Sequence, residues 1–137
     1  MKLTIDPMLI VQCNCKSCRR ITGSINIGCL YAETEAEFMG ETSVYEFAGG
    51  NGFINKAYFC SKCDERVSNK PAPEVKEGMV SIPLGFFNNT NDLAPKTGIW
   101  SEEKLTSLSK SECVLETFEG NEISERLSAL LSSLESR

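Results

Sequence analysis

Histidine is absent from all 137 residues of this chain. This absence excludes every catalytic pairing of serine or cysteine with histidine and every histidine-ligated metal, so any metal ion must be held by sulfur, with help from oxygen. Long apolar runs are lacking as well, and residues 1–7 do not have the composition of a secretory signal. Together these two absences predict a cytoplasmic protein that does not bind a membrane.

Positive charge is also scarce, because 14 Lys and Arg residues stand against 19 Asp and Glu residues and give a formal net charge of -5. Binding to nucleic acid depends on clustered Lys and Arg side chains, so nucleic acid is not an expected partner. The chain length corresponds to one domain with one compact core.

Cysteine, in contrast, occurs seven times, and three of these residues are Cys13, Cys15 and Cys18. Zinc takes thiolate sulfurs at roughly 2.3 Å in a tetrahedron, and a C-x-C-x-x-C run can fill three corners from one loop. The fourth corner is then left for water or substrate, as in catalytic zinc sites. Arg19 and Arg20 follow at once, and their positive charge favours the thiolate form. We therefore predict a Zn²⁺ site here, with redox thiols and unliganded cysteines as the alternatives.

A second pair, Cys60 and Cys63, ends an expected strand in a C-x-x-C pattern, which is a common half of a zinc site. The other half is not evident, so this second site is predicted to be incomplete. Cys29 lies among Ile and Tyr in an alternating segment and is predicted to be a small buried hydrophobe. Cys113 is predicted to be an ordinary strand or loop cysteine.

Most of the chain reads as short strands separated by turn signals, which predicts a mostly β domain. The expected strands cover residues 2–5, 8–11, 25–31, 43–47, 54–59, 79–84 and 97–101, and a helical turn is expected at residues 34–37 from a capping-box pattern. The glycine-rich residues 49–52 are expected to form a turn, because the helix that a phosphate-binding loop requires does not follow them.

The C-terminal segment differs, because apolar residues recur there at helical spacing. Asn121 can cap a helix that reaches about Glu135, with Leu127, Leu130 and Leu134 on one stripe. A helix of about 14 residues is marginal alone in water, so it must dock. Docking on its own sheet and docking on a second copy in a homodimer are both open.

The cysteine motifs and two later segments carry a family resemblance. Residues 13–23, 59–63, 80–85 and 95–100 resemble, in order and spacing, the motifs of the glutathione-dependent formaldehyde-activating enzyme family, which includes centromere protein V. The resemblance implies a β-tent (Mss4-like) zinc-binding fold over residues 1–110, followed by an extension over 111–137 with an amphipathic helix at about 122–135. It also implies that the first cysteine motif holds zinc with an accessible position. The C-x-x-C pair would join an N-terminal C-x-C in a structural zinc site.

The chain departs from the family pattern at several positions. It begins near the strand that would follow the N-terminal Gly-x-Cys-x-Cys-Gly, so Cys60 and Cys63 are expected to lack their partners. They would then be metal-free thiols, converge with the first motif on one zinc, or borrow ligands from a neighbouring molecule. Asn14 and Gly98 replace histidines that are usual in the family, and Asp64 replaces the glycine after C-x-x-C.

The resemblance implies a zinc-dependent carbon–sulfur lyase that acts on adducts of aldehydes with glutathione or a similar thiol. Arg19 or Arg20 would hold a carboxylate of the thiol. No residue is identified for proton transfer, since Glu102 and Glu103 are expected to lie in an exposed loop. The alternative is a non-catalytic, zinc-stabilised β module that binds a protein partner.

Overall fold

The computed structural model describes residues 1–108, 114–117, 119, 129 and 132–134. Cys113 and most of the helix predicted at about 122–135 lie outside these residues. Within that segment, residues 129 and 132–134 are helical. Among the described residues, no helix combines the length and the apolar character needed to cross a membrane.

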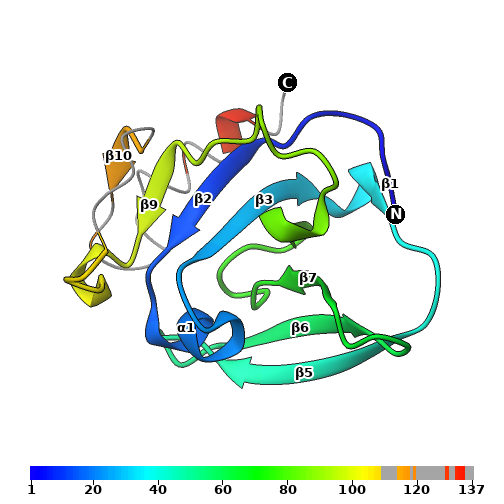
Figure 1. Cartoon of the computed structure of the whole chain (residues 1–137), viewed down its shortest axis with the longest axis horizontal. Coiled ribbons are helices and arrows are strands. Elements are labelled where there is room, and N and C mark those ends of the chain that lie inside the picture. The colour runs from blue at the N-terminus through cyan, green and yellow to red at the C-terminus, as the bar shows by residue number, and fades with distance from the viewer. Residues whose placement is uncertain (109–113, 118, 120–128, 130–131, 135–137) are drawn as a thin grey trace.

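One curled sheet of eight strands dominates the molecule, in the order β10-β9-β2-β3-β8-β7-β6-β5 (Figure 1). This confirms the prediction of a mostly β fold. The strands are β2 (Leu9–Cys13), β3 (Asn26–Ala32), β5 (Thr42–Ala48), β6 (Ile54–Cys60), β7 (Arg66–Lys70), β8 (Met79–Pro83), β9 (Thr97–Ile99) and β10 (Glu116–Thr117). A separate two-stranded sheet joins β1 (Lys2–Leu3) to β4 (Ala36–Glu37).

Helical structure within residues 1–108 is limited to one short helix and three 3₁₀ turns. These are α1 (Lys16–Thr22), η1 (Glu33–Glu35), η2 (Leu84–Phe86) and η3 (Ser101–Glu103). The turn predicted at residues 34–37 begins one residue earlier and gives way to β4. The Glu35 carboxylate accepts a hydrogen bond from the Ala32 amide at 2.9 Å, which closes that turn. The strand predicted at residues 97–101 ends at Ile99, since Trp100 adopts a left-handed conformation with φ of 55°.

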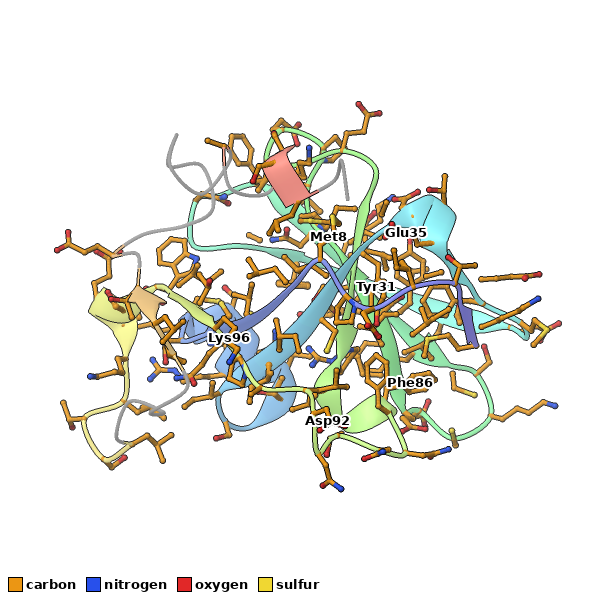
Figure 2. All side chains as sticks on the ribbon, turned by 90° about the horizontal axis from the view of Figure 1, so that it is seen from above. Met8, Tyr31, Glu35, Phe86, Asp92 and Lys96 are labelled. Carbon is orange, nitrogen blue, oxygen red and sulfur yellow. The ribbon has the colours of Figure 1, made fainter. Side chains whose placement is uncertain are left out.

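The core lies on both faces of β3, because successive side chains of a strand point to opposite sides. Leu30 packs with Met8, Val11 and Met79 on one face, whereas Tyr31 and Cys29 pack with Val80 and Ile82 on the other. In the view of Figure 2, Met8 lies above Tyr31 and Phe86 below it. Cys29 is fully buried, as predicted, and burial raises its pKa to about 11.

Leu134 packs against the face that contains Met8, Val11, Leu30 and Met79. The part of the C-terminal segment that the structure describes therefore contacts the chain's own sheet. This contact favours the first of the two docking alternatives.

Candidate metal centre and its cavity

The Sγ atoms of Cys13, Cys15 and Cys18 all lie within 4.8 Å of one another. Cys13 is the last residue of β2, Cys15 caps the start of α1, and Cys18 lies in the first turn of that helix. The Cys13 and Cys18 sulfurs are 3.5 Å apart. Sulfurs at two corners of a zinc tetrahedron would be separated by roughly 3.8 Å. The donor set therefore fits Zn²⁺ in number, chemistry and spacing.

A helix that the sequence did not suggest holds two of these cysteines. The Cys15 sulfur accepts a hydrogen bond from the Cys18 amide at 3.2 Å, in the position where Ser, Thr, Asp or Asn usually caps a helix. Gly23 ends the helix with φ of 77° and donates its amide to the Arg19 carbonyl at 2.7 Å. The motif thus folds as strand, cap and helix rather than as a simple loop.

Three neighbouring elements fix the position of this helix start. The Asn14 amide and side-chain Nδ2 both donate to the Ile99 carbonyl, at 3.1 and 2.9 Å, and bind the turn to β9. The Lys16 amide donates to Glu103 Oε2 at 2.7 Å, which ties the helix start to η3. The Ser17 hydroxyl donates to the Ala48 carbonyl at 3.0 Å, at the end of β5. Asn14 therefore positions the site through its backbone and side-chain amide contacts.

The three thiols do not ionise alike. Hydrogen bonding with Cys13, then with Cys18 and with the backbone of Cys18 and Ser17, lowers the pKa of Cys15 to about 3. Hydrogen bonding with Cys15 and burial raise the pKa of Cys13. Hydrogen bonding with Cys13 lowers the pKa of Cys18, but its contact with Cys15 and its burial outweigh this and raise it to about 12. The surroundings thus favour the anion at Cys15 more than at Cys13 or Cys18, and a cation that replaced the remaining thiol protons would bind all three sulfurs.

A half-buried cation lies close to the cluster. The Arg66 guanidinium donates through Nη2 to Asn26 Oδ1, and its charge acts on Cys18 to lower the pKa of that thiol. Burial lowers the pKa of Arg66 itself. Among the described residues its side chain makes no ion pair with a carboxylate. Sequence reasoning missed this arginine because it reaches the site from β7, far away in the chain.

The three sulfurs border a cavity of about 140 Å³ on the inner face of the curled sheet. Apolar side chains from β2, β3, β5, β8 and β9 form much of its wall: Val11, Leu30, Phe47, Met79 and Ile99. Trp100 and residues 49–51 close another side. A Cβ on Gly50 would come within 2.5 Å of the Trp100 ring, so the hairpin turn after β5 lies directly on this indole. The predicted turn is confirmed, but its place in the cavity wall was not foreseen.

Arg19 and Arg20 lie in the last turn of α1, where positive charge complements the negative end of the helix dipole. Neither residue lines the cavity. Their predicted contact with a substrate carboxylate stays a prediction. Gly98 is buried and does not line the cavity either, since its neighbour Ile99 occupies the inward position of β9.

Cys60 and Cys63 lie at the far end of β6, half-buried and exposed respectively. The start of β6 pairs with Ala48 beside α1, and seven strand residues span about 20 Å. Within the described part of the chain, neither thiol belongs to the group of three cysteines. The structure therefore does not show convergence on one four-sulfur zinc.

The turn that holds this second pair is well formed. Hydrogen bonds from the backbone of Lys62, then of Cys63, lower the pKa of Cys60. Asp64 has φ of 57°, in the left-handed region that favours glycine.

The chain matches a model of a known protein family. The model described as glutathione-dependent formaldehyde-activating enzyme matches residues 1–103. The matched segment runs from β1 through η3 and contains all three clustered cysteines. A search of curated proteins found no relative that matches the chain.

Proposed function

We propose that this chain, which belongs to the glutathione-dependent formaldehyde-activating enzyme family, is a zinc-dependent carbon–sulfur lyase. Its substrates would be adducts of aldehydes with glutathione or a similar thiol. The observation that carries the proposal is that the three clustered sulfurs border a cavity rather than being enclosed by further ligands. A structural zinc site uses four protein ligands, whereas a catalytic one keeps an open position.

Cys13, Cys15 and Cys18 would hold the metal. When bound, Zn²⁺ supplies Lewis acidity and lowers the pKa of a group at its open position. The chain contributes the surroundings. The amides of Ser17 and Cys18 point at the Cys15 sulfur and stabilise negative charge on it. Apolar walls from Val11, Leu30 and Met79 limit the water that reaches the reacting atoms and so strengthen electrostatic interactions there.

The overall reaction breaks the bond between sulfur and the former aldehyde carbon. The sulfur keeps the electron pair of that bond, the hydroxyl group of the adduct loses its proton, and the carbon–oxygen double bond of the aldehyde forms. No carboxylate is found among the described residues that line the cavity. Glu103 is engaged with the Lys16 amide. We therefore assign the proton transfer to water at the open side of the cavity.

A non-catalytic, zinc-stabilised β module is the competing function. The observation that favours it is the same lack of a carboxylate near the sulfurs within the described wall of the cavity. In that case a partner protein, rather than a small thiol, would be the ligand of the domain.

Cobalt substitution separates the two functions, because Co²⁺ reports its ligands through its absorption. We expect the protein to bind one cobalt ion at the three-cysteine site and its spectrum to change when glutathione is added. Cys18→Ser should weaken cobalt binding by at least about 10-fold, since one of three ligands is lost. Cys29→Ala is the control, because it removes a buried thiol outside the site. A spectrum typical of four sulfur ligands that does not change when glutathione is added would refute the enzymatic function and support the non-catalytic module.

A further inference from the structure

Four asparagines line the cavity, and in three of them, Asn26, Asn51 and Asn55, the side-chain oxygen already accepts a hydrogen bond from the protein. Asn51 Oδ1 accepts from the Phe53 amide at 3.0 Å, and Asn55 Oδ1 accepts from the Ala72 amide at 3.0 Å. Asn26 Oδ1 accepts from Arg66. All three asparagines line the cavity, yet they come from β3, β6 and the turn between β5 and β6. Each of the three side-chain oxygens thus has a partner within the protein, and each amino group remains as a donor.

Two of the amino groups lie beside glycines of the same wall. A Cβ placed on Gly49 would come within 2.6 Å of Asn55 Nδ2 and 3.1 Å of Asn51 Oδ1, and one placed on Gly28 would lie 3.9 Å from Asn26 Nδ2. Both glycines line the cavity. None of these three Nδ2 atoms has a hydrogen-bond acceptor among the described residues. A side-chain amide carries two N–H donors at this atom, so the wall presents unused donors to whatever enters.

The charge of the surroundings defines which acceptor fits best. The Arg66 guanidinium donates to Asn26 Oδ1 and has no carboxylate partner in the part of the chain that the structure describes. No Asp or Glu is found among the described lining residues. Hydrogen bonds to a charged acceptor are stronger than those to a neutral one. A carboxylate therefore matches this wall better than a neutral carbonyl does.

We propose that Asn26, Asn51 and Asn55 form a donor wall that selects thiol substrates bearing a carboxylate. This inference rests on the proposed function, because it assumes that the sulfur end of the substrate reaches the three cysteines. The carboxylate end then lies against the donor wall across the same cavity. Thiols of similar size without a carboxylate are disfavoured, since the amide donors would lose water without gaining a charged acceptor.

Substitution of Asn by Asp tests the wall without removing its structural contacts. Asp keeps the oxygen that accepts from Ala72 or Phe53, but it replaces the amino donor with a second, negatively charged acceptor. Cobalt-loaded protein would be titrated with glutathione and with glutathione diethyl ester, which share one thiol and one peptide but differ in their carboxylates. We expect the wild-type protein to bind glutathione at least about 10-fold more tightly than the ester. Asn55→Asp and Asn51→Asp should abolish or reverse this preference.

Asn89→Asp is the matched control. Asn89 Oδ1 also accepts a backbone amide, that of Asn91 at 3.2 Å, and its substitution adds the same charge outside the cavity. The control should keep the wild-type preference. Unchanged melting temperature and an unchanged cobalt spectrum before thiol addition would show that each variant is folded and loaded. An equal preference in wild type and both wall variants would overturn the inference, as would a wild type that does not distinguish the two thiols.

Failure of the proposed function has a different signature. In that case neither thiol changes the cobalt spectrum of the wild-type protein. Calorimetry with S-methylglutathione, which lacks a free thiol, then tests the wall alone. Binding that weakens about 10-fold or more in Asn55→Asp and Asn51→Asp supports the wall. Binding that is absent, or equal in all variants, refutes it.

Discussion

Cysteine performs two different tasks in this molecule, and the surroundings of each side chain decide which. Cys15 receives hydrogen bonds from two thiols and two backbone amides, which favour its anion. Cys29 is fully buried among Tyr31, Val80 and Ile82, where nothing compensates a charge. The first environment suits a metal ligand and the second suits a small apolar side chain.

The buried thiol makes stability depend on alkaline pH. The pKa of Cys29 is raised by burial from 9.0 to about 11, so the folded state keeps the thiol protonated while the unfolded state loses its proton. The stabilisation is complete below pH 9 and is lost as the pH rises from 9 to 11. This difference in pKa corresponds to roughly 2 to 3 kcal/mol in the free energy of unfolding. We expect Cys29→Ala to remove this part of the alkaline decline, as measured by urea unfolding between pH 8 and 11. A decline identical in the two proteins would contradict the assignment.

The residues of the candidate site differ in how far the sequence predicted them. Cys13, Cys15 and Cys18 were predictable because their spacing alone brings them together. Asn26, Asn51 and Asn55 were not, because a polar residue near a turn is unremarkable until the fold brings separate segments to one cavity. Arg66 was missed for the same reason. Arg19 and Arg20 were predicted only because they follow Cys18 directly in the sequence.

At the scale of elements, strands were easier to predict than the helix that completes the site. Alternating apolar residues indicated β3, and short runs of strand-forming residues between turn signals indicated β5, β6 and β8. Strand β7 has a short and polar sequence, Arg-Val-Ser-Asn-Lys, and is held in place by its neighbours β6 and β8. Helix α1 has only seven residues, no buried apolar stripe and a cysteine cap, so none of the usual start signals marks it.

The end of α1 offers a test of how much the site depends on this helix. Gly23 has φ of 77° and open space around its missing side chain, so Gly23→Ala adds backbone strain without a clash. Because alanine is strained in the left-handed conformation, Gly23→Ala should lower the free energy of unfolding by about 1 to 2 kcal/mol. Gly85→Ala is the control, because Gly85 also has open space but no left-handed φ. Equal stability of the two variants, measured by chemical denaturation, would show that the helix end is not held as described.

At the scale of the whole molecule, the curled sheet places the candidate metal site and the second cysteine pair at separate positions. The order of strands puts β3 and β8 in the middle and leaves β5 at one edge, next to the start of α1 through the hydrogen bond from Ser17 to Ala48. The strands curl toward one another (Figure 1), and residues of β2, β3, β5, β8 and β9 line the cavity. A metal bound there would link β2 to α1, so its removal should loosen the wall of the cavity as well as the site.

The contact of Leu134 with the central sheet predicts how the C-terminal segment contributes to stability. Leu134 packs against Met8, Val11, Leu30 and Met79 and is half-buried. Leu134→Ala should therefore lower the free energy of unfolding by about 1 to 2 kcal/mol, less than the loss for a fully buried leucine. Because the contact lies within one chain, the melting temperature of both proteins should not change with protein concentration, whereas docking on a second copy would make it rise with concentration. Leu115→Ala serves as the control, since Leu115 is 73% exposed and should contribute little. Thermal unfolding over a 100-fold range of protein concentration would distinguish the two kinds of docking. If the melting temperature rises with concentration and Leu134→Ala abolishes that rise, docking on the chain's own sheet is refuted.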